Sequence, residues 1–302
     1  MCENVCELKN VYKSYQKNSV LKDINIQLKK GKIYGFIGKN GAGKTTTMKI
    51  IAGLSFPDQG VVSVMGVSNK KELERIRRNI GCIIENPALY PEMTAQENLK
   101  ALCILYGLDW KNRVGQILEL VGLTDTGSKK VKHFSLGMRQ RLGIGMALIN
   151  NPTLLILDEP INGLDPDGIV EVRELIKKIN EDRKVTILIS SHILSEIYMM
   201  VDNYILINKG IIIEQLSQRE LEDQCQKYVL IKNGNEQAIK EVLREKLKTE
   251  NFKIMQDGSF RIYDYTENVF EIMKAFNGTA IDINGISVAK DSLEEYFFKR
   301  IG

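Results

Sequence analysis

The sequence predicts an α/β protein with an inserted helical subdomain and a small second α/β domain. Apolar runs of strand length recur along the first two-thirds of the chain, and amphipathic segments of helix length separate several of them. A glycine-rich turn near residue 40 joins one apolar run to a helical pattern. We therefore predict a first domain at 1–216, with a helical subdomain at about 86–150, and a second domain at 217–302.

Composition and charge narrow the class of protein before any motif is used. Hydrophobic residues make up 43% of the 302 residues and charged residues 26%, which is typical of a globular chain with a sizeable core. The net charge of +4 is too small to indicate a nucleic-acid partner, so we expect none. The five scattered cysteines predict neither a disulfide framework nor a zinc site. The sequence shows no signal peptide and no apolar run of the roughly 18 residues that a membrane helix needs, so we expect a cytoplasmic chain.

The first domain is predicted from strands and helices that surround the glycine-rich turn. Strand patterns occur at residues 10–15, 21–32, 33–38, 153–160, 185–192 and 204–215. Helical patterns occur at residues 45–54, 94–107, 111–123, 135–149 and 167–182. Because a helix stands between the strands at 153–160 and 185–192, we expect a parallel crossover there.

The second domain is predicted from a change of pattern after about residue 216. Seven segments alternate in the order β-α-β-β-α-β-α, and none carries a glycine-rich phosphate loop. We see no catalytic chemistry in this domain. Two roles stay open for it: a regulatory ligand sensor, or a structural part that extends a dimer or supports the core.

A phosphate-binding loop is predicted at Gly38 to Thr45. The segment GKNGAGKT matches the pattern G-x4-G-K-[ST], and it follows an apolar strand and opens a helix, as the motif requires. Gly41 and Gly43 allow successive backbone N–H groups to curl around phosphate oxygens, and the helix N-terminus adds a positive dipole end. The candidate nucleotide-binding residues of the loop are Gly38, Asn40, Gly41 and Gly43.

Three side chains at the start of the following helix complete this candidate site. Lys44 would reach the β- and γ-phosphates, Thr45 would bind Mg²⁺, and Thr46 could donate a hydrogen bond to the α-phosphate. The alternative is a glycine-rich turn that binds no ligand. We prefer the P-loop NTPase core, because the motif stands in the structural context that it requires.

Two adjacent carboxylates, Asp158 and Glu159, follow the apolar run LLIL. A charge at the edge of a core is costly unless a ligand or a partner compensates it. If this run is a parallel strand beside the loop strand, Asp158 lies near the metal ion. Glu159 could then hold or deprotonate an attacking water. The alternative is a pair of solvated acids in a loop.

A second helix start is suited to anions. Ser135 is predicted to cap the helix at 135–149, Gly137 leaves the backbone accessible, and Arg139 and Arg141 follow. This segment lies far along the chain from Lys44, so a head-to-tail partner could supply it to the nucleotide. The segment NKGI, at 208–211, lacks the Asp that guanine recognition requires, so GTP specificity is not supported.

The first 215 or so residues resemble the nucleotide-binding subunits of ABC transporters. The motifs GKNGAGKTT, SLGMRQ, LLILDEP and NGLD occur in the order of that family. The resemblance implies a P-loop NTPase core with a mixed sheet and an antiparallel β-subdomain. It also implies that two subunits enclose two ATP molecules, each between the phosphate loop of one chain and the signature helix of the other.

The resemblance implies roles for further residues. Tyr15 would stack on adenine. Ser135 and Gly137 would contact the γ-phosphate of the partner's nucleotide, and Asp165 would lie at the dimer seam. His192 would contact the γ-phosphate and hold both the water and Glu159, which together with Lys44 would form the catalytic group.

The chain departs from the family pattern at two places. Glu85 stands where the family usually has Gln, a residue that contacts Mg²⁺; a carboxylate can still bind the metal, so Thr45, Glu85 and Asp158 are the candidate metal ligands. Leu136 and Met138 replace a Gly and a Gln of the usual signature. Both departures resemble the branch that serves bacitracin export and lantibiotic immunity.

The resemblance implies an ATP-hydrolysing subunit that uses ATP and Mg²⁺ and forms a homodimer or a heterodimer. It would work on a separate membrane permease, with a permease helix docked near residues 85–102, and would lie on the inner face of the cell membrane. The branch predicts export of an antimicrobial peptide or a similar amphiphile. The alternative is a soluble ABC-type ATPase that acts on nucleic acid or ribosomes; we would expect such a chain to carry two ATPase modules, a long coiled coil or Cys clusters, and the sequence has none of these.

Overall fold

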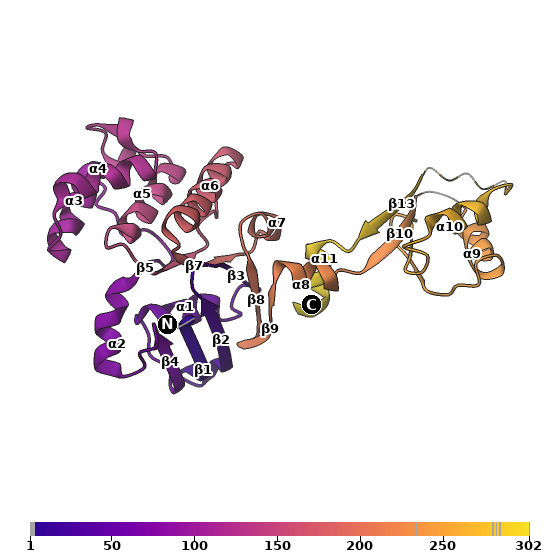
Figure 1. Ribbon diagram of the computed structural model, residues 1–302, viewed down its shortest axis with the longest axis horizontal. Helices are drawn as coiled ribbons and strands as arrows, with labels where there is room; N and C mark the ends of the chain where they lie inside the picture. The colour runs from indigo at the N-terminus through magenta and orange to yellow at the C-terminus, as the bar shows by residue number, and fades with distance from the viewer. Residues whose placement is uncertain (1–3, 233–234, 280, 282, 284, 302) are drawn as a thin grey trace. The chain divides into compact units, whose positions relative to one another are not determined.

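The structure is a computed structural model that describes residues 4–232, 235–279, 281, 283 and 285–301. The chain divides into two compact units, one that runs to Gln218 and one from Arg219 to Arg300 (Figure 1). Among the described residues, the first unit has two sheets and the second has one, and each unit has its own buried cluster of apolar side chains. No helix among the described residues is both long and apolar enough to cross a bilayer.

A six-stranded sheet forms the centre of the first unit, with the strand order β5-β6-β7-β3-β8-β9. The strands are β3 (Ile33–Ile37), β5 (Ile80–Ile83), β6 (Leu154–Asp158), β7 (Thr186–Ser191), β8 (Asn203–Asn208) and β9 (Ile211–Ser217). The first five strands of this order are parallel to one another, and β9 pairs antiparallel with β8. Strands β3, β6 and β7 are buried along their whole length, as is expected for parallel strands covered on both faces. Their carboxyl ends therefore meet at one edge of the sheet, where α/β proteins bind ligands.

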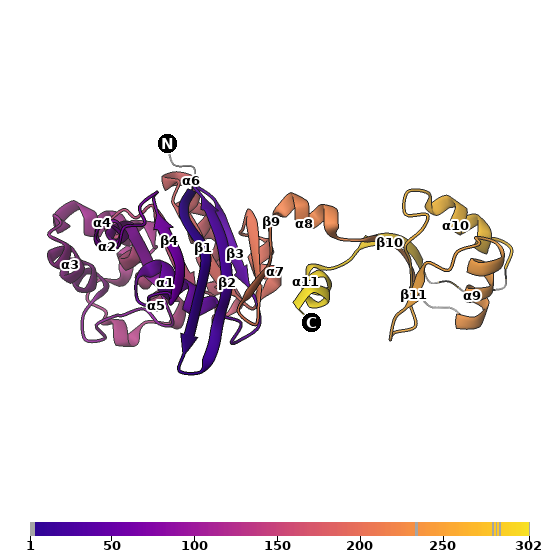
Figure 2. The same ribbon diagram turned by 90° about the horizontal axis from the view of Figure 1, so that it is seen from below.

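A three-stranded antiparallel sheet, β2-β1-β4, completes the strands of the first unit. It consists of β1 (Asn4–Tyr15), β2 (Asn18–Lys29) and β4 (Gln59–Val64), and Figure 2 shows β1 and β2 running side by side. The apolar side chains of β1 and β2 pack with those of α1 (Lys44–Ala52) in a single buried cluster. This cluster fixes the helix that follows the glycine-rich turn.

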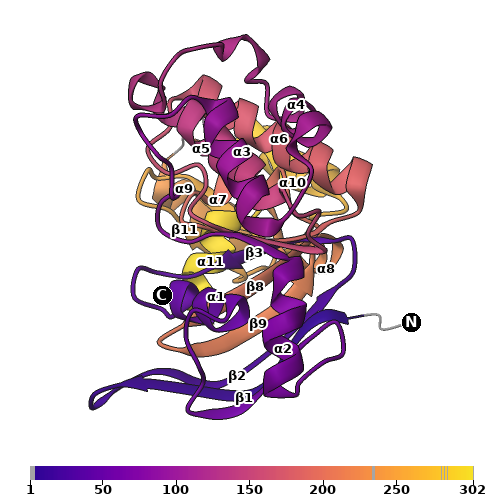
Figure 3. The same cartoon turned by 90° about the vertical axis from the view of Figure 1, so that its left-hand side faces the viewer.

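The remaining α-helices of the first unit lie on both sides of the six-stranded sheet. They are α2 (Lys70–Ile76), α3 (Ala95–Tyr106), α4 (Trp110–Leu120), α5 (Leu136–Leu148), α6 (Pro166–Arg183) and α7 (Leu194–Tyr198). Figures 1 and 3 show α3, α4, α5 and α6 on one side of the six-stranded sheet, with α1 and the antiparallel sheet on the other. The chain between β5 and β6 is thus mainly helical, and a capping box at Thr94 begins α3.

The second unit is a four-stranded antiparallel sheet with the order β11-β12-β10-β13. Its elements are α8 (Gln218–Gln224), β10 (Lys227–Lys232), α9 (Glu236–Glu245), β11 (Phe252–Ile254), β12 (Phe260–Ile262), α10 (Val269–Phe276), β13 (Gly285–Lys290) and α11 (Leu293–Ile301). From β10 onward they follow the predicted order, and α8 is additional. Parts of the predicted elements at residues 233–234, 280, 282, 284 and 302 lie outside the described residues.

The predicted fold class is confirmed: a mixed parallel sheet carries the glycine-rich turn, and a separate antiparallel sheet packs with its helix. Some elements had no sequence prediction, namely β4, α2, β5, α7 and α8. These elements are short and lack a long apolar period, so pattern alone does not distinguish them from loops.

Candidate functional site

The phosphate loop connects β3 to α1, and two of its glycines adopt left-handed backbone conformations. Gly41 has φ +78° and Gly43 has φ +113°. A Cβ on Gly43 would also lie 2.6 Å from Cδ2 of Leu21, so both the conformation and the space require glycine. The backbone N–H of Ala42 donates to the carbonyl of Lys39 at 3.0 Å and closes the turn. The loop is therefore fixed by its own sequence, with the exposed Asn40 at its tip.

Lys44 is the first residue of α1 and has only 6% of its surface exposed. Its Nζ donates to the carbonyl oxygen of Gly38 at 2.7 Å and to that of Lys39 at 3.4 Å, and it lies 3.9 Å from Oε1 of Glu159. Burial lowers the pKa of Lys44, and the Glu159 and Asp158 carboxylates partly oppose this effect. A buried ammonium bound mainly by carbonyl oxygens is suited to an anionic ligand.

Thr45 and Asp158 meet, although the sequence places them far apart. The hydroxyl of Thr45 donates to Oδ2 of Asp158 at 2.8 Å, and the hydroxyl of Ser190 donates to Oδ1 of the same carboxylate at 2.5 Å. In the parallel pairing of β6 with β7, Asp158 lies opposite Ser190. The hydroxyl and carboxylate oxygens are the hard donors that a small divalent cation prefers. Thr46 follows in the first turn of α1.

Glu159 lies directly after β6 in a left-handed conformation, with φ +50°. This conformation is strained for a residue other than glycine, and such strain is concentrated at functional sites. The backbone N–H of Glu159 donates to Oγ of Ser190 at 2.9 Å, and its Oε2 lies 2.8 Å from Nδ1 of His192. The arrangement holds a carboxylate and an imidazole together beside the ammonium of Lys44, which is a geometry suited to general base chemistry.

Glu85 lies after β5, also in a left-handed conformation, with φ +70°. Its Oε1 accepts a hydrogen bond from Nζ of Lys49 at 2.6 Å. This contact lowers the pKa of Glu85 and raises the pKa of Lys49. The structure thus brings two of the three predicted metal ligands, Thr45 and Asp158, into contact, and it holds the third on Lys49.

Tyr15 ends β1, and its side chain is 46% exposed. Its hydroxyl lies 3.2 Å from Oγ of Ser55, and Nζ of Lys13 lies 5.2 Å from the ring centroid. The ring is oriented by these contacts and is accessible, as a base-stacking platform must be.

A second cluster joins the start of α5 to the turn before α6. Ser135 accepts a hydrogen bond from the N–H of Met138 at 3.2 Å, which confirms that it caps α5. Asp165 caps α6 in the same manner, through the N–H of Gly168 at 3.0 Å. A Cβ built on Gly137 would lie 3.9 Å from Cα of Gly168, so the two helix starts are close. Among the described residues, no hydrogen bond or ion pair connects this cluster to the phosphate loop.

Two residues of the site were not singled out from the sequence, Ser190 and Lys49. Ser190 could have been found from the assumption that the strands at 153–160 and 185–192 pair in parallel, because their ends then lie side by side. Lys49 had a weaker signal: it lies four residues after Thr45, on the same face of a helix. Neither signal identifies the contacted atom.

A phosphate-binding loop, a hydroxyl bound to the carboxylate at the end of β6, and a second carboxylate paired with a histidine define a P-loop nucleoside triphosphatase. Comparison with known proteins narrows this class. Residues 21–162 match the family model described as ABC transporter. The bacitracin transport ATP-binding protein BcrA of Bacillus licheniformis is 41% identical over 96% of this chain and 95% of its own length.

Two further comparisons agree with this match. The lantibiotic transport ATP-binding protein SrtF of Streptococcus pyogenes is 45% identical over 68% of this chain and 88% of its own length. An ATP-binding cassette solved as a dimer, bound to ADP and Pi, aligns with a TM-score of 0.64 at 28% identity, over 71% of this chain and 99% of that chain. The chain therefore belongs to the family of ABC transporter ATP-binding proteins. It binds and hydrolyses ATP as a subunit of such a transporter.

Proposed function

We propose that this subunit powers the export of an antimicrobial peptide or a similar amphiphile. The observation that supports this proposal is the 41% identity to a bacitracin transport protein along nearly the whole chain, including the second unit. A relative named for lantibiotic transport matches 68% of this chain. The departures from the family pattern at Glu85, Leu136 and Met138 resemble the same branch.

The residues of the site support specific roles in ATP hydrolysis. Thr45 and Asp158 would hold Mg²⁺, and the bound ion would neutralise charge on the phosphates. Lys44 would bind the β- and γ-phosphates with the backbone of Gly38 to Gly43. Glu159 would accept a proton from the attacking water, while His192 fixes its carboxylate through the 2.8 Å contact.

We propose a composite site formed by two subunits, which are two copies of this chain or this chain and a close relative. Ser135 and Gly137, at the start of α5, would donate to the γ-phosphate of the nucleotide held by the partner. Asp165 fixes the neighbouring turn by capping α6. A solved relative that is dimeric with ADP and Pi is consistent with this arrangement.

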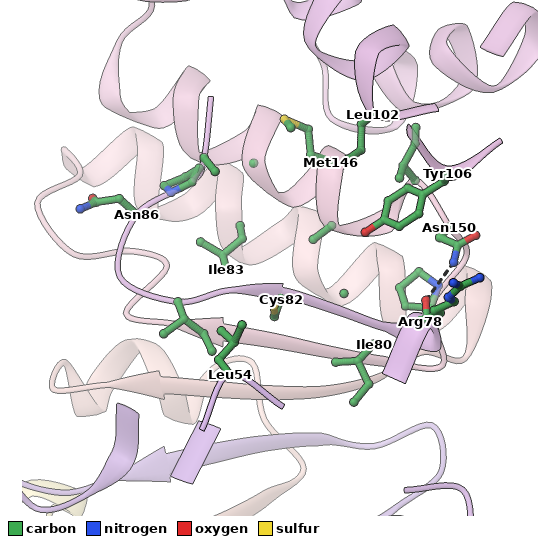
Figure 4. Close-up of a pocket in the computed structure, with 18 residues that line it drawn as sticks. Leu54, Arg78, Ile80, Cys82, Ile83, Asn86, Leu102, Tyr106, Met146 and Asn150 are labelled. Atoms are coloured by element: carbon green, nitrogen blue, oxygen red, sulfur yellow. Dashed lines mark hydrogen bonds between the residues drawn. The ribbon is translucent and has the colours of Figure 1, made fainter. Parts of the chain in front are cut away.

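We propose that a membrane permease docks at a pocket between the sheet and the helical subdomain. The pocket has a volume of about 320 Å³ and contains side chains of β5, α3 and α5, including Ile83, Leu102, Tyr106 and Met146 (Figure 4). The exposed Leu54 adds apolar surface at its edge. A largely apolar pocket that contains an unbranched, adaptable side chain such as Met is suited to a helix of a partner.

The permease would hold this subunit on the cytoplasmic face of the membrane. We place the boundary of the ATP-binding domain at residue 216 and assign the second domain, 217–302, a structural role in extending the dimer or supporting the core. A role as a regulatory ligand sensor is the alternative.

The Glu159→Gln variant tests the composite site. General base catalysis contributes about 10²- to 10⁴-fold, so phosphate release should fall by about that factor while ATP still binds. The mass in solution, measured with and without Mg-ATP, should change from that of a monomer to that of a dimer. Control variants are Glu159→Gln with Ser135→Ala, which should dimerise less, and Glu267→Gln in the second unit, which should behave as the unmodified chain.

A variant that binds ATP and stays monomeric with the permease present would contradict the composite site. Retention of phosphate release would contradict the role of Glu159. The substrate is tested by deletion of the gene: sensitivity to peptide antibiotics should rise, and unchanged sensitivity would exclude the proposed cargo.

A further inference from the structure

Helix α1 presents two functional side chains on one face, one turn apart. Thr45 and Lys49 are separated by four residues, which places their side chains about 5 to 6 Å apart along the helix surface. Thr45 donates to Asp158 at 2.8 Å, and Lys49 donates to Glu85 at 2.6 Å. Two side chains of α1, one helical turn apart, therefore bind two different carboxylates, Asp158 of the phosphate site and Glu85.

The Lys49–Glu85 pair is a poor source of stability. The Glu85 side chain is 65% exposed and that of Lys49 is 34% exposed, and pairs in such positions contribute little to the free energy of unfolding. Glu85 nevertheless adopts the left-handed conformation at φ +70°, which is unfavourable for a glutamate. The ion pair with Lys49 is too weak to explain the strained backbone of Glu85. The strain indicates that the location of the Glu85 carboxylate matters more than the energy of the pair.

Charge explains why the position matters. A free carboxylate one helical turn from Thr45 could become an additional ligand of a cation held by Thr45 and Asp158, because a flexible acidic side chain is a preferred ligand of divalent metals. It would also repel a triphosphate. Lys49 neutralises this charge and holds the Glu85 oxygen on α1.

We propose that Lys49 is a positioning residue that holds the Glu85 carboxylate away from the cation of the ATP site and so sets the concentration of Mg²⁺ that the site requires. This inference rests on the proposed Mg-ATP site. It assigns Lys49 no contact with nucleotide. When Lys49 is replaced, Glu85 is released and the site takes up Mg²⁺ at lower concentration.

The test is a double-mutant cycle on the full chain with the fluorescent nucleotide mant-ATP as the probe. The variants are Lys49→Gln, Glu85→Gln and the double variant, with Lys49→Arg as the conservative variant that keeps the ion pair. Binding of mant-ATP is followed while Mg²⁺ is titrated, and the midpoint concentration of Mg²⁺ is compared. Fluorescence of Trp110, the single tryptophan, shows that each variant is folded.

Removal of the lysine charge alone lowers the midpoint to some extent in any background, so the comparison between backgrounds is decisive. We expect Lys49→Gln to lower the midpoint by up to about fivefold more when Glu85 is present than in the E85Q background, since exposed pairs of this kind couple by up to about 1 kcal/mol. Lys49→Arg should retain the midpoint of the unmodified chain.

Equal shifts in both backgrounds would overturn the inference, because Lys49 would then act only as a charge. That result leaves the proposed ATP site intact, since nucleotide still binds. If the unmodified chain binds no mant-ATP at any Mg²⁺ concentration, the proposed function is wrong and the inference is wrong with it.

Discussion

Lys44 in the phosphate loop and Arg261 in the second unit are both largely buried cations, but their partners differ. Lys44 donates to the carbonyl oxygens of Gly38 and Lys39, and its nearest carboxylate oxygen is 3.9 Å away. Arg261 forms two parallel hydrogen bonds with the Glu295 carboxylate, at 2.8 and 2.7 Å, and its guanidinium lies 4.4 Å from the ring centroid of Tyr228.

The pKa shifts of the two cations have opposite directions. Burial lowers the pKa of Lys44, whereas the hydrogen bonds to Glu295 raise the pKa of Arg261. A cation whose charge is incompletely compensated is ready to bind an anion, while a cation in a bidentate pair with a carboxylate stabilises the structure around it. Burial of a charge alone therefore does not identify a binding site. The atoms that compensate the charge must be known as well.

Replacement of Lys44 should weaken ATP binding strongly while it changes the free energy of unfolding only slightly. Lys44→Met removes charge-assisted hydrogen bonds to phosphate worth about 1.5 to 3 kcal/mol, so ATP affinity should fall about 10- to 100-fold. The free energy of unfolding without nucleotide should change by less than about 1 kcal/mol, because the native state already disfavours this charge. Isothermal titration with ATP and urea unfolding measure the two quantities.

The matched control is Arg261→Met, which should leave ATP affinity unchanged and should loosen the second unit, since Glu295 then loses both hydrogen bonds. Hydrogen exchange of the β10 and β12 amides would report this loosening. If both variants changed stability equally and neither changed ATP affinity, Lys44 would not differ from Arg261 as a ligand-binding cation.

Much of the phosphate site could be predicted from the sequence, because most of its residues belong to two short continuous motifs. The glycine loop, Lys44 and Thr45 form one continuous motif, and the strand before Asp158 is long and apolar enough to be recognised. The sequence places the strand of Asp158 beside the loop strand, whereas β7 lies between β6 and β3 in the sheet. Thr45 still reaches Asp158, because the carboxyl ends of these parallel strands meet at one edge of the sheet.

The contacts of Glu85 and Arg261 could not be predicted in this way. Lys49 and Glu85 come from separate elements, α1 and the turn after β5, and β5 itself had no sequence prediction. Arg261 and Glu295 lie on β12 and α11, and no motif relates them. Pairs of charges that only the tertiary fold brings together leave no periodic signal in the sequence.

The contribution of the Arg261–Glu295 pair to stability should depend on pH. The hydrogen bonds from Arg261 lower the pKa of Glu295, so this carboxylate holds its proton more weakly in the folded state than in the unfolded state. Its contribution to stability is therefore complete above the ordinary value of 4.5 and is lost as the pH falls below it, through the lower folded pKa. We expect Glu295→Gln to destabilise the second unit by about 1 kcal/mol at pH 7, after allowance for solvent screening.

This difference between Glu295→Gln and the unmodified chain should shrink as the pH falls from 5 toward 3, when measured by hydrogen exchange of the β12 amides. Glu267→Gln is the control, because Glu267 pairs with Lys227 at the surface, where its side chain is 81% exposed. A difference that stays constant with pH would show that Glu295 acts through its shape and not through its charge.

Replacement of Tyr15 should change ATP affinity least among these variants. It tests whether the site recognises the base of ATP in addition to the phosphates. Stacking of an aromatic ring contributes about 0.5 to 1.5 kcal/mol, so Tyr15→Ala should weaken ATP binding by about threefold to tenfold. Tyr15→Phe keeps the ring and loses only the contact with Ser55, so its ATP affinity should stay close to that of the unmodified chain.

Inorganic triphosphate, which has no base, should bind equally to all three proteins. If Tyr15→Ala weakened triphosphate binding as much as ATP binding, Tyr15 would act by supporting the loop between α1 and β4 through Ser55, and the site would recognise the phosphates without a contribution from this ring.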